Sequence, residues 1–187
     1  MPPAETATLM KYLKSRKELF YYEFGSGGST YVACETPNVK TIWSMESDTA
    51  YFEKLSAEPV IKQAINSKKL TYMLAEVGCR NNWGHPVPGT PKEHWLNYFQ
   101  HITDLYYMPD VILIDGRFRV ACALYTHMVV DEHATILFDD FTDRSFYHDV
   151  LKYFYIIETI GRLVVLKKKI NTEIDQADID QYETDPR

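Results

Sequence analysis

The sequence predicts an α/β protein in which a mostly parallel sheet of seven strands has helices on both faces and ends in an antiparallel hairpin. Three observations support this fold class: short apolar runs recur along the chain, segments with helical spacing separate them, and the last two runs are joined by a tight turn. The chain has 187 residues, of which 45% are hydrophobic, so it can bury one core and is too short for two full-sized domains. We therefore expect a single domain over residues 1–170.

Five runs rich in β-branched and aromatic residues are typical of buried parallel strands. They cover residues 19–24, 39–45, 70–75, 111–115 and 134–139. Helical spacing predicts helices between them, at 48–55 with a continuation at 60–65, at 93–105 and at 119–130. Two further runs, 155–160 and 163–166, flank the turn Gly161-Arg162 and must run antiparallel to each other.

The net charge of −6 lies mostly in residues 171–187, which contain six acids and one arginine and predict an acidic, flexible tail. The body is close to neutral and has no basic face, so we expect no nucleic-acid partner. No apolar run approaches the roughly 18 to 20 residues of a membrane helix, and the start of the chain lacks the order of a secretion signal. We therefore expect a soluble, cytoplasmic protein without a membrane partner.

A glycine-rich turn, EFGSGGST, follows the first strand and precedes a predicted helix. Glycines at such a turn let the backbone bend sharply and approach a ligand closely. Glu46 ends the second strand, where an acid can accept hydrogen bonds from both ribose hydroxyls, although it could instead be a solvated acid that starts a turn. The predicted cofactor-binding residues are Glu23, Gly25, Ser26, Gly27, Gly28, Ser29, Thr30, Glu46, Ser47, Asp115 and, near an adenine, Glu76.

Two details of this turn indicate which nucleoside it binds. Thr30 stands where a dinucleotide fingerprint has its third glycine, and Glu23 would repel a pyrophosphate but attract a cationic methionine group. The E-x-G-x-G-G form resembles motif I of the S-adenosylmethionine-dependent methyltransferases. This resemblance implies a Rossmann-like class I methyltransferase fold, whose seventh strand is reversed as in the predicted hairpin, and a role for Glu23 at the amino-acid end of the cofactor.

Two predicted strands end in aspartates, in the segments IDGR and FDD. The carboxyl ends of neighbouring parallel strands share one edge of the sheet, so Asp115, Asp139 and Asp140 should converge beside the cofactor. Three carboxylates could hold Mg or Mn and activate a hydroxyl. Alternatively, the acids cap the next helices, or Arg117 and Arg119 neutralise them and leave Asp115 or a histidine as general base. The candidate catalytic residues are Asp115, Arg117, His148 and His85.

The segments IDGRFRVACAL and ILFDDFTDRSFYHDV, with WGHPVP and Trp95-x-x-Tyr98, resemble methyltransferase-like domains that accompany glycosyltransferases in bacteria and large DNA viruses. The resemblance covers most of residues 19–168 and implies a sugar O-methyltransferase, with Asp115, Asp139 and Asp140 as metal ligands. Arg117 departs from that pattern, because the metal-dependent sugar enzymes commonly have an acid there as general base.

The same resemblance implies a glycan or small-molecule acceptor, such as the deoxysugar rhamnose. It also implies that the chain could be part of a larger glycosyltransferase polypeptide in the cytoplasm, which is the host cytoplasm if the protein is viral. Trp83, Trp95 and Tyr98 could stack on sugar faces or simply pack. Two other functions stay open: an NAD-dependent oxidoreductase, which Thr30 and the hairpin disfavour, and a non-catalytic methyltransferase-like interaction domain.

Overall fold

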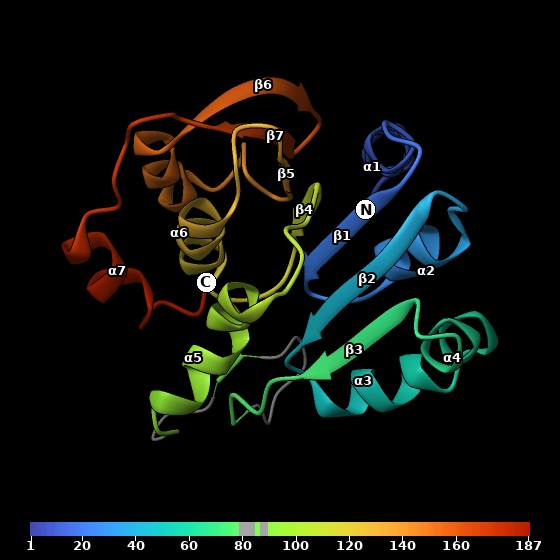
Figure 1. The fold of residues 1–187 in the computed structure, drawn as a ribbon. Coiled ribbons are helices and arrows are strands. Elements are labelled where there is room, and N and C mark those ends of the chain that lie inside the picture. Colours follow the sequence, from blue (N-terminus) through green and yellow to red (C-terminus); the bar gives the residue numbers. More distant parts are fainter. Residues whose placement is uncertain (79–84, 87–89) are drawn as a thin grey trace.

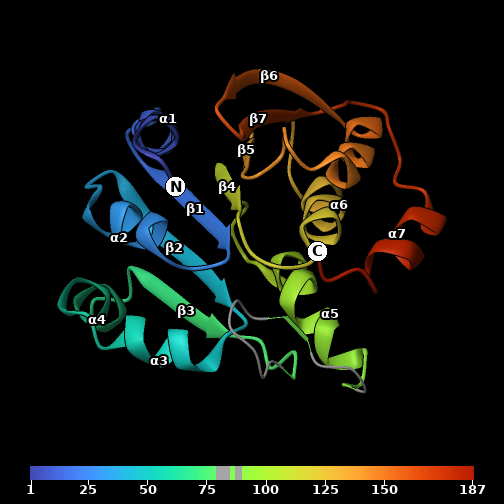
Figure 2. The same cartoon turned by 180° about the vertical axis from the view of Figure 1, so that it is seen from behind.

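The computed structural model describes residues 1–78, 85–86 and 90–187 and contains the predicted seven-stranded sheet (Figures 1 and 2). The strand order is β3-β2-β1-β4-β5-β7-β6. Strands β1 to β5 are parallel, and β7 runs antiparallel to both β5 and β6, which confirms the predicted hairpin. The bounds are β1 Leu19–Phe24, β2 Val39–Glu46, β3 Leu70–Leu74, β4 Val111–Ile114, β5 Thr135–Phe138, β6 Phe154–Ile160 and β7 Leu163–Lys168.

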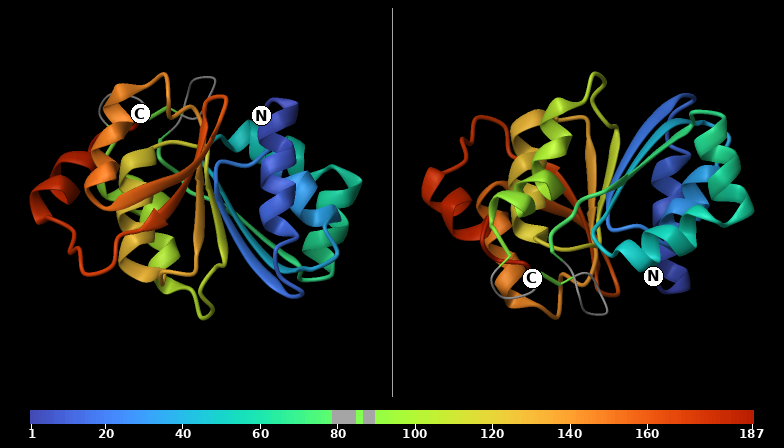
Figure 3. Two further views of the ribbon diagram at one scale, coloured as in Figure 1. Left: turned by 90° about the horizontal axis from the view of Figure 1, so that it is seen from above. Right: turned by 90° about the horizontal axis from the view of Figure 1, so that it is seen from below.

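Helices cover both faces of the sheet, as Figure 3 shows in views from above and below. One face holds α1 (Pro3–Leu13), α2 (Gly28–Glu35), α3 (Thr49–Ser56) and α4 (Pro59–Asn66). The other holds α5 (Glu93–Gln100), the 3₁₀ helices η1 (His101–Asp104) and η2 (Ser145–Lys152), α6 (Arg119–Val129) and α7 (Gln176–Tyr182). Within the described ranges, no helix is long and apolar enough to cross a membrane.

The two apolar cores follow the alternation of side chains along each strand. Tyr21 and Leu113 pack into the core under α1 to α4, whereas their neighbours Tyr22 and Ile112 pack into the core under α5 and α6. A strand that is buried on both faces has apolar residues at consecutive positions, because successive side chains point to opposite sides of the sheet. This explains why continuous apolar runs, rather than alternating ones, predicted the strands.

The structure differs from the predicted helices at several points. The segment predicted as one helix over 93–105 divides into α5 and η1, and α4 starts anew at Pro59, which is well suited to a first helical position. Two elements of the structure, α1 and η2, are absent from the predicted set. Each contributes only a few buried apolar side chains, Leu9 and Leu13 from α1 and Tyr147 and Val150 from η2.

The acidic segment 171–187, for which the sequence predicts a flexible tail, includes a helix that packs against the rest of the protein. It contains α7, whose Asp178 accepts hydrogen bonds from Lys152 Nζ at 2.9 Å and from Tyr153 OH at 2.7 Å. Ile179 and Tyr182 are buried in the core on the α6 side. Composition alone predicts disorder here, because it does not reveal that the acids have partners and that two apolar residues three positions apart form a buried face.

Candidate functional site

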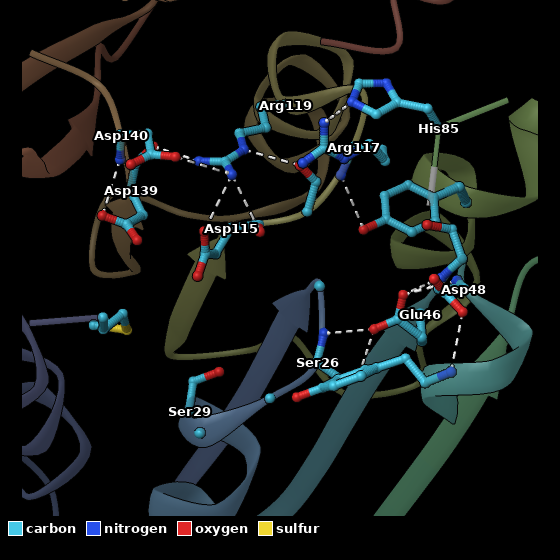
Figure 4. A pocket seen from close by; sticks show the side chains of 18 of the residues that line it. Ser26, Ser29, Glu46, Asp48, His85, Asp115, Arg117, Arg119, Asp139 and Asp140 are labelled. Carbon is cyan, nitrogen blue, oxygen red and sulfur yellow. Dashed lines mark hydrogen bonds and ion pairs between the residues drawn. The ribbon is translucent and has the colours of Figure 1, made fainter. Parts of the chain in front are cut away.

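A cavity of about 730 Å³ lies at the carboxyl ends of the central strands (Figure 4). This is the edge at which ligands bind in open α/β sheets. Most of the predicted site residues come together there. Those that line the cavity are Gly25, Ser26, Gly27, Gly28, Ser29, Glu46, Ser47, His85, Asp115, Arg117, Asp139 and Asp140.

The glycine turn lines this cavity and packs closely against the turn that follows β4. Gly25 has φ of +90°, and a Cβ there would lie 2.7 Å from Gly116 Cα, while a Cβ on Gly116 would lie 2.9 Å from Gly25 N. Both positions therefore require glycine, one for its backbone conformation as well as its space. A Cβ on Gly28, in contrast, would meet nothing within 4 Å, so the space beside Gly28 is open to a ligand.

Two predicted cofactor ligands, Glu23 and Thr30, lie beneath the turn and are not among the described residues that line the cavity. Thr30 Oγ1 accepts a hydrogen bond from Gly27 N at 2.8 Å and donates one to the Glu23 carboxylate. Ser44 Oγ at 2.7 Å and Tyr21 OH at 2.9 Å also donate to Glu23, and burial raises its pKa. Because Glu23 is fully buried with these partners, it supports the turn, and the predicted direct contact with a cofactor is corrected to this role.

Glu46 does face the cavity, at the end of β2. Its Oε1 accepts hydrogen bonds from the backbone of Ser47 at 2.7 Å and Asp48 at 2.9 Å, and its Oε2 accepts one from Ser26 Oγ at 2.5 Å. The carboxylate is thus fixed in one orientation at the wall of the cavity. Glu76 is exposed and is not among the described residues that line the cavity, so its contact with an adenine stays a prediction.

The three aspartates of the reaction site line one cavity, and arginines pair with the carboxylates of two of them, Asp115 and Asp140. Arg119 is 3% exposed, and its Nη2 lies 3.2 Å from Asp115 Oδ1 and 3.5 Å from Asp140 Oδ2. Arg119 also donates to the carbonyl oxygens of Gly116 at 2.9 Å and Asp139 at 2.7 Å. The structure therefore agrees with the alternative in which arginines neutralise the aspartates, and Arg119 lies between Asp115 and Asp140.

These contacts do not fit a divalent cation. Asp140 also binds Arg144 at 2.7 Å and Arg162 at 2.5 Å, so guanidinium groups occupy both carboxylate oxygens of Asp140. Within the part of the chain that the structure describes, no group of three or more His, Cys, Asp or Glu residues is arranged to hold a metal ion. The predicted metal site at Asp115, Asp139 and Asp140 consequently has no support in the geometry.

Asp115 is a cavity residue whose pKa is shifted toward neutrality. Burial raises the pKa of Asp115 to about 7; Arg119 opposes this rise, and the charges of Asp139 and Asp140 add to it. Its side chain is 29% exposed, and it lines the cavity. A carboxyl group with a pKa near neutrality that reaches a cavity can take up and release a proton at physiological pH, which is the property of a general base.

The two candidate histidines lie in different surroundings. His85 Nε2 lies 2.8 Å from Arg117 Nη1 in the cavity, and burial together with the charge of Arg117 lowers the pKa of His85. His148 is not one of the described cavity residues: its Nε2 bonds to the carbonyl oxygen of Phe141 at 3.0 Å, and its ring stacks on Phe141. The prediction that His148 acts as a base is therefore corrected to a packing role.

Neither described aromatic candidate presents a free ring to a sugar. Tyr98 is fully buried with its hydroxyl oxygen accepting a hydrogen bond from Arg117 N at 3.3 Å, and Trp95 packs against Phe118. Trp83 lies outside the described residues. Sequence reasoning missed Arg144 and Arg162 as cavity residues. Asp140 and Arg144 are four residues apart in a segment of turns before η2, so no helical spacing in the sequence indicated their ion pair.

No protein-family model and no curated protein matches this chain. Among solved structures, a methyltransferase-like protein from Silicibacter pomeroyi is 30% identical, with a TM-score of 0.83 over 100% of this chain and 96% of that chain. An O-methyltransferase from Bacillus cereus in complex with SAH is 14% identical, with a TM-score of 0.63 over 90% of this chain and 82% of that one. The tRNA (m1A58) methyltransferase TrmI from Aquifex aeolicus is 14% identical, with a TM-score of 0.55 over 92% and 70%.

The last two likenesses show the fold alone, and they agree with the strand order and the reversed β7. The first is of another kind, because its sequence identity extends along the whole chain. The chain therefore belongs to the family of the Silicibacter pomeroyi methyltransferase-like protein and has the fold of the class I S-adenosylmethionine-dependent methyltransferases.

Proposed function

We propose that this protein is an S-adenosylmethionine-dependent O-methyltransferase that acts on a hydroxyl of a sugar or glycan, a deoxysugar included. The observation that carries the proposal is one cavity with two different walls. The glycine turn and Glu46 form one wall, and Asp115, whose pKa burial raises, forms part of the other. The cavity volume of about 730 Å³ lies within the range of small-molecule sites.

The residues present fit the cofactor. Gly27 and Gly28 line the cavity without side chains, and the open space beside Gly28 leaves room for the methionine end of the ligand. Glu46 is placed to accept ribose hydroxyls once Ser26 Oγ turns to Tyr72 OH, which already lies 2.8 Å from it. When bound, the cofactor supplies a methyl group activated by an adjacent sulfonium.

Asp115 would handle the proton of the acceptor. As a carboxylate it accepts the hydroxyl proton, and its raised pKa makes it a stronger base than an ordinary aspartate. Arg119, 3.2 Å from Asp115 Oδ1, balances the charge of the ionised form. The role of the protein is otherwise to hold the acceptor in line, since positioning supplies most of the catalysis in such transfers.

We propose no divalent cation at this site, because Arg119, Arg144 and Arg162 already bind the carboxylates of Asp115 and Asp140. We also propose that the domain is part of a larger glycosyltransferase polypeptide, whose product would supply the glycan acceptor. The NAD-dependent alternative is not favoured, because the structural neighbours are methyltransferases. A non-catalytic role is the outcome that the following experiment would reveal.

Binding of S-adenosylhomocysteine, measured by calorimetry, tests the cofactor assignment. We expect the wild-type protein to bind it and Gly28→Val to lose binding with an unchanged melting temperature, since the added side chain enters open space. Glu46→Gln should weaken binding, whereas Glu53→Gln, an exposed position on α3, should not. Equal binding by Gly28→Val, Glu46→Gln and the wild-type protein would contradict the assignment. Transfer of a labelled methyl group from S-adenosylmethionine to sugars then tests the proposed acceptor.

A further inference from the structure

Arg117 differs from the other described arginines of the cavity in its partner. Three of them bind carboxylates, namely Arg119, Arg144 and Arg162. Arg117 instead donates from Nη1 to His85 Nε2 at 2.8 Å and forms no ion pair with any described carboxylate. The residues outside the description, 79–84 and 87–89, include no Asp or Glu in the sequence.

The partner of Arg117 carries no balancing negative charge. Burial and the charge of Arg117 lower the pKa of His85, which keeps the imidazole neutral with Nε2 as the acceptor. Burial, together with the charges of Arg119 and Arg144, in turn lowers the pKa of Arg117. A half-buried guanidinium near two other guanidinium groups is unfavourable unless an anion compensates for its charge, since buried charges in proteins are normally paired.

The wall around Arg117 has an excess of positive charge. Among the described lining residues, that wall has four guanidinium groups and three carboxylates, those of Asp115, Asp139 and Asp140. Burial raises the pKa of Asp115 to about 7, so Asp115 is only partly ionised at physiological pH. The three carboxylates then compensate for even less of the positive charge of the four guanidinium groups. The acids Glu46 and Asp48 lie on the opposite wall with Ser26, as Figure 4 shows.

We infer that Arg117, oriented by His85, binds an anionic group of the acceptor, so that the acceptor is an acidic sugar carrying a carboxylate or a phosphate. The planar guanidinium fork is suited to both groups, which it can bind through two parallel hydrogen bonds. The inference rests on the proposed function for the presence of a sugar acceptor. It changes the expected role of Arg117 from catalysis to substrate binding, and makes His85 a positioning residue.

The two residues that flank Gly116 then act on one substrate, with Asp115 accepting the hydroxyl proton and Arg117 binding the anionic group. Asp115 and Arg117 both line the cavity from the turn after β4, and Arg117 N is held by Tyr98 OH at 3.3 Å. An anion on Arg117 therefore fixes the substrate from the same rigid turn that carries the proposed base. Such shared support is how a binding group can place a hydroxyl beside its base.

Calorimetric titration with matched sugars tests this inference. Glucose, glucuronate and glucose 1-phosphate are titrated into the protein with and without saturating S-adenosylhomocysteine. We expect at least one of the two anions to bind at least about tenfold more tightly than glucose, which is the effect of one or two charge-assisted hydrogen bonds. The affinity for that anion should fall as salt is added. The anion that binds more tightly identifies the carboxylate or the phosphate as the source of the charge.

Variants assign this preference to Arg117. Arg117→Gln should abolish it and still fold, because no carboxylate loses a partner, while Arg117→Lys should keep part of it. Arg16→Gln, whose guanidinium binds Asp110 away from the cavity, should leave the preference unchanged. His85→Ala should weaken anion binding at an unchanged melting temperature, and His85→Gln, which keeps an acceptor, should restore it.

The outcomes separate this inference from the proposed function. If neither anion binds better than glucose, or if Arg117→Gln keeps the preference, the inference is overturned whatever S-adenosylhomocysteine does. If S-adenosylhomocysteine does not bind the wild-type protein, the cofactor assignment fails, and the titrations without it still decide whether Arg117 forms an anion site.

Discussion

Replacing Arg119 by glutamine tests whether one buried guanidinium holds the ends of β4 and β5 together. Arg119 is 3% exposed, donates to the carbonyl oxygens of Gly116 at 2.9 Å and Asp139 at 2.7 Å, and pairs with Asp115 and Asp140. Glutamine is shorter and neutral, so it can replace one of these hydrogen bonds at most. The variant therefore leaves buried acceptors unsatisfied and removes the cation that contacts both Asp115 and Asp140.

The magnitude follows from these contacts. Each hydrogen bond from a charged donor contributes about 1.5 to 3 kcal/mol, and losing one partner of a buried ion pair costs about 3 to 5 kcal/mol. Two factors reduce the sum: Asp140 keeps Arg144 and Arg162, and Asp115 can relieve its charge by taking up a proton. We expect the free energy of unfolding to fall by about 3 kcal/mol, a large part of the stability of a typical domain.

Urea unfolding followed by circular dichroism measures this loss. Arg16→Gln is the matched control, because its exposed ion pair with Asp110 should contribute less than about 1 kcal/mol. The loss in Arg119→Gln should also be larger at about pH 8 than at about pH 6, since Asp115 is ionised only at the higher pH. A loss below about 1 kcal/mol, equal at both pH values, would refute the central role of Arg119.

Two further predictions concern titration. If Asp115 is the base, turnover should rise with pH through about 7 and be lost in Asp115→Asn, which should still bind S-adenosylhomocysteine; a pH-independent turnover, or an active Asp115→Asn, would exclude this role. Burial lowers the pKa of His127 to about 4, with Lys168 adding to the effect, so the unfolded chain takes up this proton at a higher pH than the folded one does. The free energy of unfolding should therefore fall as the pH drops from about 6.5 to about 4, and His127→Gln should show a shallower decline in acid denaturation; parallel curves for both proteins would count against this interpretation.

Local sequence determined most of the fold because its signals act over short distances. Continuous apolar runs predicted the five parallel strands, and Gly161-Arg162 between two such runs predicted the final hairpin. The glycine turn and the aspartates at strand ends were predicted for the same reason: a turn after a strand and a polar residue at its end are properties of adjacent residues. Helix boundaries were less certain, as α4 and η1 show.

The candidate site depended more on tertiary structure. Glu23 occupies the turn motif, but its side chain lies on the same face of β1 as Tyr21 and is enclosed by Thr30 and Ser44, so it supports the turn from below. His148 follows the predicted DD segment closely, yet its ring turns to Phe141. In both cases the residue was correctly placed along the chain, and the direction of its side chain decided its role.

By itself, the sequence determined that strands and helices alternate around a glycine turn, and that acids stand at the carboxyl edge of the sheet. Only the tertiary structure decided what neutralises those acids. Arg162 reaches Asp140 because β7 pairs with β5, where Phe141 N donates to Arg162 O at 2.8 Å. Ion pairs of this kind join residues distant in the chain, so their charge balance, and the arginine left without a carboxylate, depend on strand order and not on local pattern.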